Sequence, residues 1–183
     1  EPALSVILNI DADHLDYFKT LENIIRSFHQ FALQTSRLLI INGDDANTRK
    51  AVEGIPSEKL LTFGFDEGNR YRAVDIADTK RACERFTVLK DGAPLCEVSL
   101  RIPGKHNIYN ALAAVAVADY MGVDAQTIAE SLHQFTGVHR RFEILGTFNG
   151  VTVADDFSHN PTELTQTLNA AMQIGFREVS EGF

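Results

Sequence analysis

A chain of 183 residues, 44% hydrophobic and 23% charged, can build one core, or one domain with part of another, and it is too apolar to be disordered. Its formal net charge of −8 argues against binding a nucleic acid through its phosphates. The sequence shows neither an apolar run of membrane-spanning length nor a signal-peptide pattern, so we expect no membrane partner. Two cysteines, Cys83 and Cys96, make no disulfide framework, which suggests a reducing, cytoplasmic setting.

The first 65 residues predict a parallel sheet with crossover helices. Three short apolar runs rich in Val, Ile and Leu are typical of strands buried on both faces. Apolar residues recur at helical spacing after the first run, and Asp44 or Asp45 can cap a helix that ends near Gly54. The strands are expected at residues 4–10, 37–41 and 60–65, and the helices at residues 20–34 and 44–54.

The pattern then changes to antiparallel pairing and further helices. Asp91-Gly92 is a hairpin turn between two apolar runs, and Asn149-Gly150 marks a second hairpin. Asn at the N-cap, Pro at N1 and Glu at N3 make residues 160–163 a strong helix start. The expected hairpins join residues 85–89 to 95–102 and surround residues 149–150, and the expected helices cover residues 106–121, 125–135 and 160–175.

These elements predict an α/β protein with a mostly parallel sheet, crossover helices and an appended antiparallel hairpin. We place a domain boundary near residues 143–146, so that residues 1–143 form one unit and residues 144–183 begin another. The chain opens almost directly on a strand and closes just after a helix, so we expect it to be a piece of a longer protein.

Residues 9–16 (NIDADHLD) are the first candidate site. They follow a buried strand, and in open α/β sheets ligands bind at the carboxyl ends of strands. Three acids and His14 within six residues could hold a hard cation or a phosphate-bound metal. The alternative is a polar loop with a helix-capping aspartate.

Residues 103–107 (PGKHN) open an alanine-rich helix, and a helix N-terminus suits an anionic or polar ligand. The Gly-Lys pair is not a P-loop, because Ser99 stands where the earlier glycine is needed and His106 where Ser or Thr is needed. A simple capped helix start is the alternative interpretation.

Two further segments lie on either side of the predicted boundary. In residues 137–143 (GVHRRFE), Arg140 and Arg141 could bind phosphate across a cleft or form surface salt bridges. Residues 155–161 (DDFSHNP) put two acids and a histidine between a strand and a helix, which is typical of a site. The alternative there is capping, which Asn160 alone can provide.

The order of these landmarks is more specific than any one of them. NIDADHLDYF, NGDD, PGKHNIYNALAA, GVHRRFE and DDFSHNPTE, in this order over essentially the whole chain, resemble the Mur ligases. Within the family, the pattern is most similar to the ligases that use ATP to join L-alanine to UDP-N-acetylmuramate through an acyl phosphate. The resemblance implies the second half of a central ATP-binding domain, followed by the beginning of a Rossmann-like C-terminal domain.

The resemblance also implies roles for individual residues around ATP and Mg²⁺. His14 matches the histidine that helps to ligate magnesium. Asn107 matches the asparagine that contacts adenine, with His106 and Asn110 beside it as nucleotide-binding residues.

Three residues near the boundary match catalytic positions of the family. Arg141 corresponds to the arginine that reaches the ATP phosphates, and Asp156 and His159 to residues near the substrates. Because Asp156 and His159 belong to the last domain, we expect them to act only after domain closure. Without ligand, we expect them to be distant from His14 or poorly placed relative to it.

Departures from the family pattern leave the substrate open. Phe157 and Asn160 replace the usual Tyr and second His, and Phe157 is also seen in ligases that recycle murein tripeptide. The alternatives are such a ligase, another member such as a folylpolyglutamate synthetase, or a non-catalytic binding module. The P-loop and the acidic metal ligand are not in this sequence, so we expect the chain alone to be inactive. Its oligomeric state is left open.

Overall fold

The computed structural model describes residues 1–78, 83–176 and 179. Within these residues six strands form one sheet whose spatial order equals the chain order. Strands β1 to β4 pair in parallel, whereas β5 and β6 add antiparallel pairs. The strands are β1 (Leu4–Ile7), β2 (Leu38–Asn42), β3 (Leu60–Gly64), β4 (Tyr71–Asp78), β5 (Cys83–Lys90) and β6 (Ala93–Pro103).

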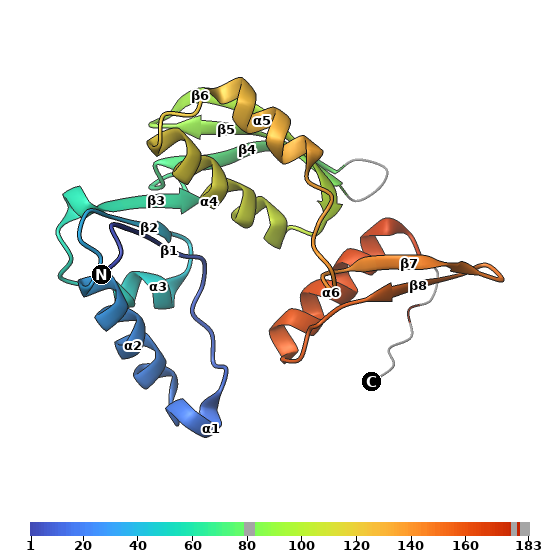
Figure 1. Ribbon diagram of the computed structural model, residues 1–183, viewed down its shortest axis with the longest axis horizontal. Coiled ribbons are helices and arrows are strands. Elements are labelled where there is room, and N and C mark those ends of the chain that lie inside the picture. The colour runs from blue at the N-terminus through green and yellow to red at the C-terminus, as the bar shows by residue number, and fades with distance from the viewer. Residues whose placement is uncertain (79–82, 177–178, 180–183) are drawn as a thin grey trace.

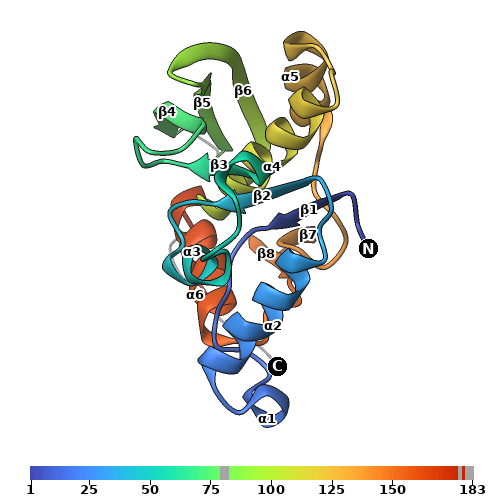
Figure 2. The ribbon, with the colours of Figure 1, turned by 90° about the vertical axis from the view of Figure 1, so that its left-hand side faces the viewer.

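Helices cover both faces of the parallel part of the sheet, as Figures 1 and 2 show. Strand β2 explains this arrangement, because all five of its residues are buried and successive side chains point to opposite faces. Leu38 and Ile40 pack toward α4 (His106–Tyr120), and Leu39 and Ile41 pack toward α2 (Leu21–Leu33) and α3 (Ala46–Ala51).

The remaining elements extend these layers. Helix α5 (Ala125–Gln134) packs against β6, and α1 (Leu15–Phe18) is a single turn after β1. A 3-10 turn covers Ser57–Lys59. No helix among the described residues is long and apolar enough to cross a membrane.

A second, smaller unit follows α5. Strands β7 (Glu143–Phe148) and β8 (Val151–Asp155) form a two-stranded antiparallel sheet, and α6 (Pro161–Ile174) follows them. Figure 1 shows this unit beside the end of α4 that leads back to β6. A Cβ built on Gly104, just before α4, would lie 3.6 Å from the Cβ of Ala170, so α6 packs closely against the start of α4.

Local sequence signals account for most element boundaries. The side chains of Thr20, Asp45, Asp124 and Asn160 each accept a hydrogen bond from the backbone N–H three residues ahead, as N-cap residues do. The predicted α/β fold with its hairpins and helices is confirmed.

Strand β4 is absent from the sequence-based prediction. Its polar–apolar alternation is broken by a bulge between Val74 and Ala77, where Asp75 adopts a positive φ of 53°. The expected strand and helix ends otherwise differ from the observed ones by a few residues.

Candidate functional site

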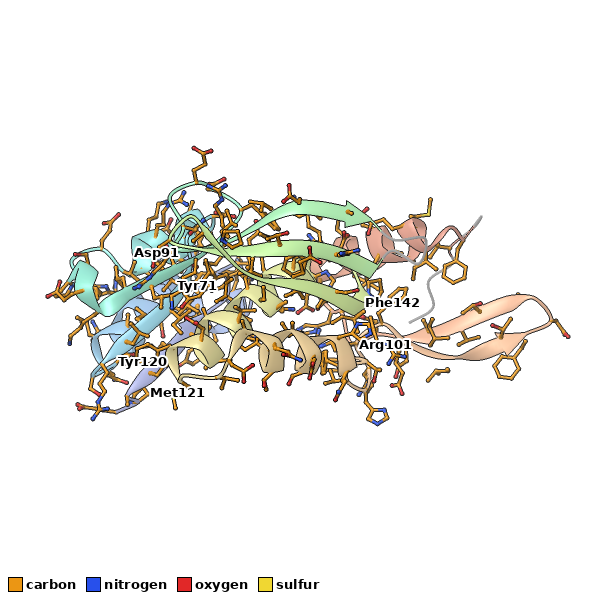
Figure 3. All side chains as sticks on the ribbon, turned by 90° about the horizontal axis from the view of Figure 1, so that it is seen from above. Tyr71, Asp91, Arg101, Tyr120, Met121 and Phe142 are labelled. Carbon is orange, nitrogen blue, oxygen red and sulfur yellow. The ribbon has the colours of Figure 1, made fainter. Side chains whose placement is uncertain are left out.

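A cleft of about 2060 Å³ lies between the start of α4, the end of β6 and the small unit. Its walls include Arg101 from β6 and Phe142 from the connection before β7. Figure 3 shows these two residues close together beside the base of the β7–β8 hairpin, with Tyr71 and Asp91 away from them on the left of the view. Five of the residues expected from the sequence line the cleft: His106, Asn107, Asn110, Arg141 and Asp156.

The entry into α4 is shaped by Gly104. Its φ is +101°, which L-residues with a side chain rarely adopt, and a Cβ there would meet the His106 ring at 2.6 Å. His106 Nδ1 is buried and has no hydrogen-bond partner among the described residues. Burial lowers the pKa of His106 and nearby Arg141 adds to this, while Asp156 opposes it, so the ring is neutral near pH 7. A neutral imidazole with an unpaired nitrogen at the cleft wall suits a polar ligand.

The two asparagines of α4 are linked to each other. Asn107 Nδ2 donates to the carbonyl of Pro103 at 2.7 Å, and Asn107 Oδ1 accepts from Asn110 Nδ2 at 3.1 Å. To bind both edges of a base, Asn107 has to exchange at least one of these partners. Asn110 is exposed and lines the cleft.

Asp156 is held firmly at the base of the small unit. Its carboxylate accepts hydrogen bonds from the backbone N–H of Phe142 at 2.7 Å and of Ser158 at 2.8 Å, and from the Ser158 hydroxyl. Burial, the largest influence, raises the pKa of Asp156, but these hydrogen bonds lower it below its ordinary value. Asp156 is therefore ionised, and its charge acts on His106.

Glu163 is a residue that the sequence analysis treated only as part of a helix start. One of its oxygens lies 3.9 Å from Arg141 Nη1, and the other lies 3.4 Å from His159 Nδ1. Its position at N3 of a capping box was the available signal. Glu163 thus connects the cleft to a second group of side chains.

That second group consists of Asp13, His14 and His159, and one ligand atom from each lies within 4.8 Å of the others. His14 Nε2 and His159 Nε2 lie 3.8 and 3.9 Å from Asp13 Oδ2. Asn160 Nδ2 also approaches Asp13 Oδ2 at 3.4 Å, and Thr162 donates to Asp11 at 2.7 Å. The loop after β1 and the start of α6 are therefore in contact.

This contact corrects one expectation from the sequence. We expected Asp156 and His159 to be distant from His14, or poorly placed relative to it, without ligand, but the His14 and His159 rings are only 6.4 Å apart. The expected distance was wrong for His159, because the hydrogen bonds of Asp11 and Asp13 hold the start of α6 against the loop after β1.

Asp44, at the end of β2, lines the same cleft but has a different environment. Its carboxylate accepts hydrogen bonds from Phe65 N at 2.6 Å, Asp66 N at 3.2 Å, Asn69 Nδ2 at 2.6 Å and Tyr109 Oη at 3.0 Å. A Cβ on Gly64 would clash with this carboxylate. The expected capping role falls to Asp45, which bonds Thr48 N at 2.6 Å.

The fold agrees with comparisons to known proteins. Residues 1–118 match the family model described as the Mur ligase middle domain. The chain therefore belongs to the Mur ligases, as the order of its motifs suggested.

Individual relatives show which members of the Mur ligase family the chain resembles. The chain is 44% identical over 97% of its length to the UDP-N-acetylmuramate–L-alanine ligase of Caldanaerobacter subterraneus subsp. tengcongensis, and spans 39% of that protein. It is 31% identical to the crystal structure of UDP-N-acetylmuramate-alanine ligase MurC from Thermotoga maritima, with a TM-score of 0.76 over 94% of this chain and 39% of that chain. MurF from Acinetobacter baumannii is 27% identical, with a TM-score of 0.82 over 94% of this chain and 38% of that one.

Proposed function

We propose that this chain is part of an ATP-dependent ligase that joins L-alanine to UDP-N-acetylmuramate through an acyl phosphate, a step of peptidoglycan precursor synthesis. The observation that carries the proposal is the 44% identity to a ligase of that name over 97% of the chain. We place the reaction in the cytoplasm, and we assign residues 1–143 to the central domain and residues 144–183 to the start of the last one.

The cleft supplies groups suited to a nucleotide. In the proposal, His106, Asn107 and Asn110 bind the adenosine part of ATP, because neutral imidazole and amide groups offer both donors and acceptors. The unpaired Nδ1 of His106 fits this role. Arg141 binds phosphate, since the planar guanidinium of arginine matches the geometry of oxyanions.

In the proposal, magnesium binds at the edge of the same region. The proposal makes His14 a ligand in the complete enzyme, and Asp13 adds a carboxylate beside it. The ion supplies charge stabilisation for phosphoryl transfer. Asp156 and His159 act near the substrates, with Asp156 fixed in place by Phe142 and Ser158.

A chimera tests the proposal because the chain spans 39% of its relative from Thermotoga maritima. The matching segment of that ligase is replaced by these 183 residues, and phosphate release is measured with UDP-N-acetylmuramate, ATP, magnesium and L-alanine. We expect turnover that depends on L-alanine, and none from the 183 residues alone. In the chimera, Arg141→Ala should lower kcat, and Asn107→Ala should raise KM for ATP.

A folded chimera that ignores L-alanine but accepts a preformed murein tripeptide would contradict the substrate assignment. Turnover by the 183 residues alone would contradict the view that they need a phosphate-binding loop from elsewhere. His133→Ala, on the outer helix α5, is the matched control and should leave KM and kcat unchanged.

A further inference from the structure

Arg140 and Arg141 are neighbours in the connection before β7, and of the two Arg141 lines the cleft. Arg140 is engaged by the small unit, since its Nε lies 3.5 Å from Asp155 Oδ2 and its guanidinium carbon lies 4.7 Å from the centre of the Phe157 ring. The charge of Arg141 acts instead on His106, at the start of α4. The orientation of the Arg141 guanidinium therefore depends on other contacts than those of its neighbour.

Glu163, in the first turn of α6, is an acidic partner of Arg141. Its Oε1 lies 3.9 Å from Arg141 Nη1. Its Oε2 accepts a hydrogen bond from the backbone N–H of His159 at 3.2 Å and lies 3.4 Å from the ring Nδ1 of the same residue. One carboxylate is thus shared between the residue proposed to bind phosphate and a residue proposed to act near the substrates.

This ion pair lies within a hydrogen-bonded part of the chain. The Phe142 N–H donates to Asp156 Oδ2 at 2.7 Å, and the Phe157 N–H donates to the carbonyl of Arg140 at 2.9 Å. These bonds lie on both sides of Arg141 and join the connection before β7 to the loop that precedes α6. The backbones that carry the two charges are therefore held in a fixed relation, so a movement of the small unit against the sheet would keep the pair.

The exposure of the two side chains indicates that the pair matters little for stability. The side chains of Arg141 and Glu163 are 52% and 32% exposed, and ion pairs as accessible as this contribute little to folding. A guanidinium, however, binds an oxyanion through two parallel hydrogen bonds only when its plane faces that anion. Because a guanidinium carries five donors, a carboxylate on one edge restricts its orientation and leaves donors for a phosphate.

We propose that Glu163 is a positioning residue, whose carboxylate orients the Arg141 guanidinium for phosphate and holds the start of α6, with His159, at the same point. The inference rests on the proposed function and deepens it, since there Arg141 acts without a partner. Glu163 also stands at the N3 position of its helix, where a glutamate commonly accepts from the backbone. Glu163→Gln separates the two roles, because the amide oxygen still accepts from the His159 N–H but carries no charge.

Kinetics of the chimera separate orientation from folding. Relative to the wild-type chimera, Glu163→Gln should lower kcat about tenfold and change KM for ATP less than about twofold, with Tm unchanged. In an Arg141→Ala background the same substitution should have no further effect on kcat, since there is no guanidinium left to orient. Glu130→Ala removes an exposed carboxylate from α5, is the matched control and should behave as the wild type does.

Binding of inorganic pyrophosphate to the 183-residue chain gives a second test, in which the sign of the change is informative. If Glu163 acted only through its charge, its removal would strengthen the binding of an anion, whereas a loss of orientation weakens it. We expect the Kd for pyrophosphate, followed by the NMR signal of the Arg141 Nε–H group, to rise several-fold in Glu163→Gln.

Three results would overturn the inference: wild-type kcat in Glu163→Gln, additive losses of kcat in the double variant, or pyrophosphate binding that is unchanged or tighter. The wild-type chimera tests the ligase activity by itself, so a failure of the proposed function is recognised before any variant of Glu163 is compared. The pyrophosphate titration uses neither UDP-N-acetylmuramate nor L-alanine, and it tests the Arg141–Glu163 pair in either case.

Discussion

Asp13 and Asp44 follow neighbouring parallel strands, β1 and β2, and yet their carboxylates have opposite environments. Asp44 accepts four hydrogen bonds from two backbone N–H groups, an amide and a phenol. Asp13 is partly exposed, accepts hydrogen bonds from its neighbour His14 N at 2.7 Å and from Asn160 Nδ2 at 3.4 Å, and faces two imidazoles at 3.8 and 3.9 Å. A carboxylate at the end of a strand thus serves structure when donors from distant residues surround it, and keeps acceptor capacity for a ligand when fewer donors do.

The largest effect is expected when Asp44 is removed. Asp44→Ala leaves the donors of Phe65, Asn69 and Tyr109 without their acceptor in a partly buried place. We expect unfolding to become easier by about 3 kcal/mol, with Tm lower by roughly 8 °C. Thermal unfolding measures this, with Asp66→Ala as an exposed control in the same turn. A Tm within a degree of the wild type would show that the four hydrogen bonds contribute little.

A smaller loss is expected when only one donor is removed. Tyr109→Phe keeps the ring that packs on Phe65, with centroids 4.4 Å apart, and deletes the hydroxyl that bonds Asp44. The expected cost is about 1 kcal/mol in urea unfolding. Tyr17→Phe, a change at an exposed tyrosine, serves as the control. Equal losses in the two variants would contradict a specific role for the Tyr109 hydroxyl.

The same hydroxyl predicts a dependence on alkaline pH. Burial, followed by the Asp44 carboxylate, raises the pKa of Tyr109 above its usual value near 10. Above pH 10 the unfolded chain releases this proton while the folded chain keeps it, so the stability falls as the pH rises. Unfolding midpoints between pH 8 and 11 should fall more steeply for the wild type than for Tyr109→Phe. Parallel curves would contradict the assignment.

A second tyrosine, Tyr71, allows the same pH dependence to be tested in a double variant. Burial raises its pKa as well, with Asp119 adding to the effect, and its hydroxyl donates to Asp119. The double variant Tyr71→Phe/Tyr109→Phe should therefore show the flattest curve of the three above pH 10.

The smallest effect on stability is expected at the other carboxylate. Asp13→Asn keeps the shape of the side chain and an oxygen acceptor for the His14 N–H, so Tm should not change measurably. We expect the Asp13→Asn substitution to weaken metal binding instead. A large drop in Tm would place Asp13 with Asp44 as a structural residue and remove the contrast between the two.

Much of this arrangement could be predicted from the sequence because its signals are local. The Asn-Pro-x-Glu start of α6, the Asp-Gly and Asn-Gly turns and the apolar runs of the parallel strands all appear where they were expected. Strand β4 was missed because the bulge at Asp75 breaks its alternation. The motifs also indicated the residues of the cleft, which come together at the start of α4.

Long-range contacts could not be predicted in the same way. No local pattern tells that His159 meets Asp13, or that Tyr109 bonds to Asp44 across 65 positions. The hydrogen bond that Asn107 Nδ2 donates to the Pro103 carbonyl could not be predicted either, because it depends on how the chain turns at Gly104. These features come from packing in three dimensions, which composition and spacing do not encode.

The close approach of Gly64 to Asp44 has a consequence for the divergence of related sequences. A methyl group at position 64 and a carboxylate at position 44 cannot occupy the same space. The two positions should therefore change together: relatives with a side chain at position 64 should lack an acidic residue at position 44. In those relatives the position of Tyr109 should no longer require a tyrosine, because its hydroxyl would have no carboxylate to bond. Covariation of these three positions among related sequences would therefore reflect a single steric conflict, between a side chain at position 64 and a carboxylate at position 44.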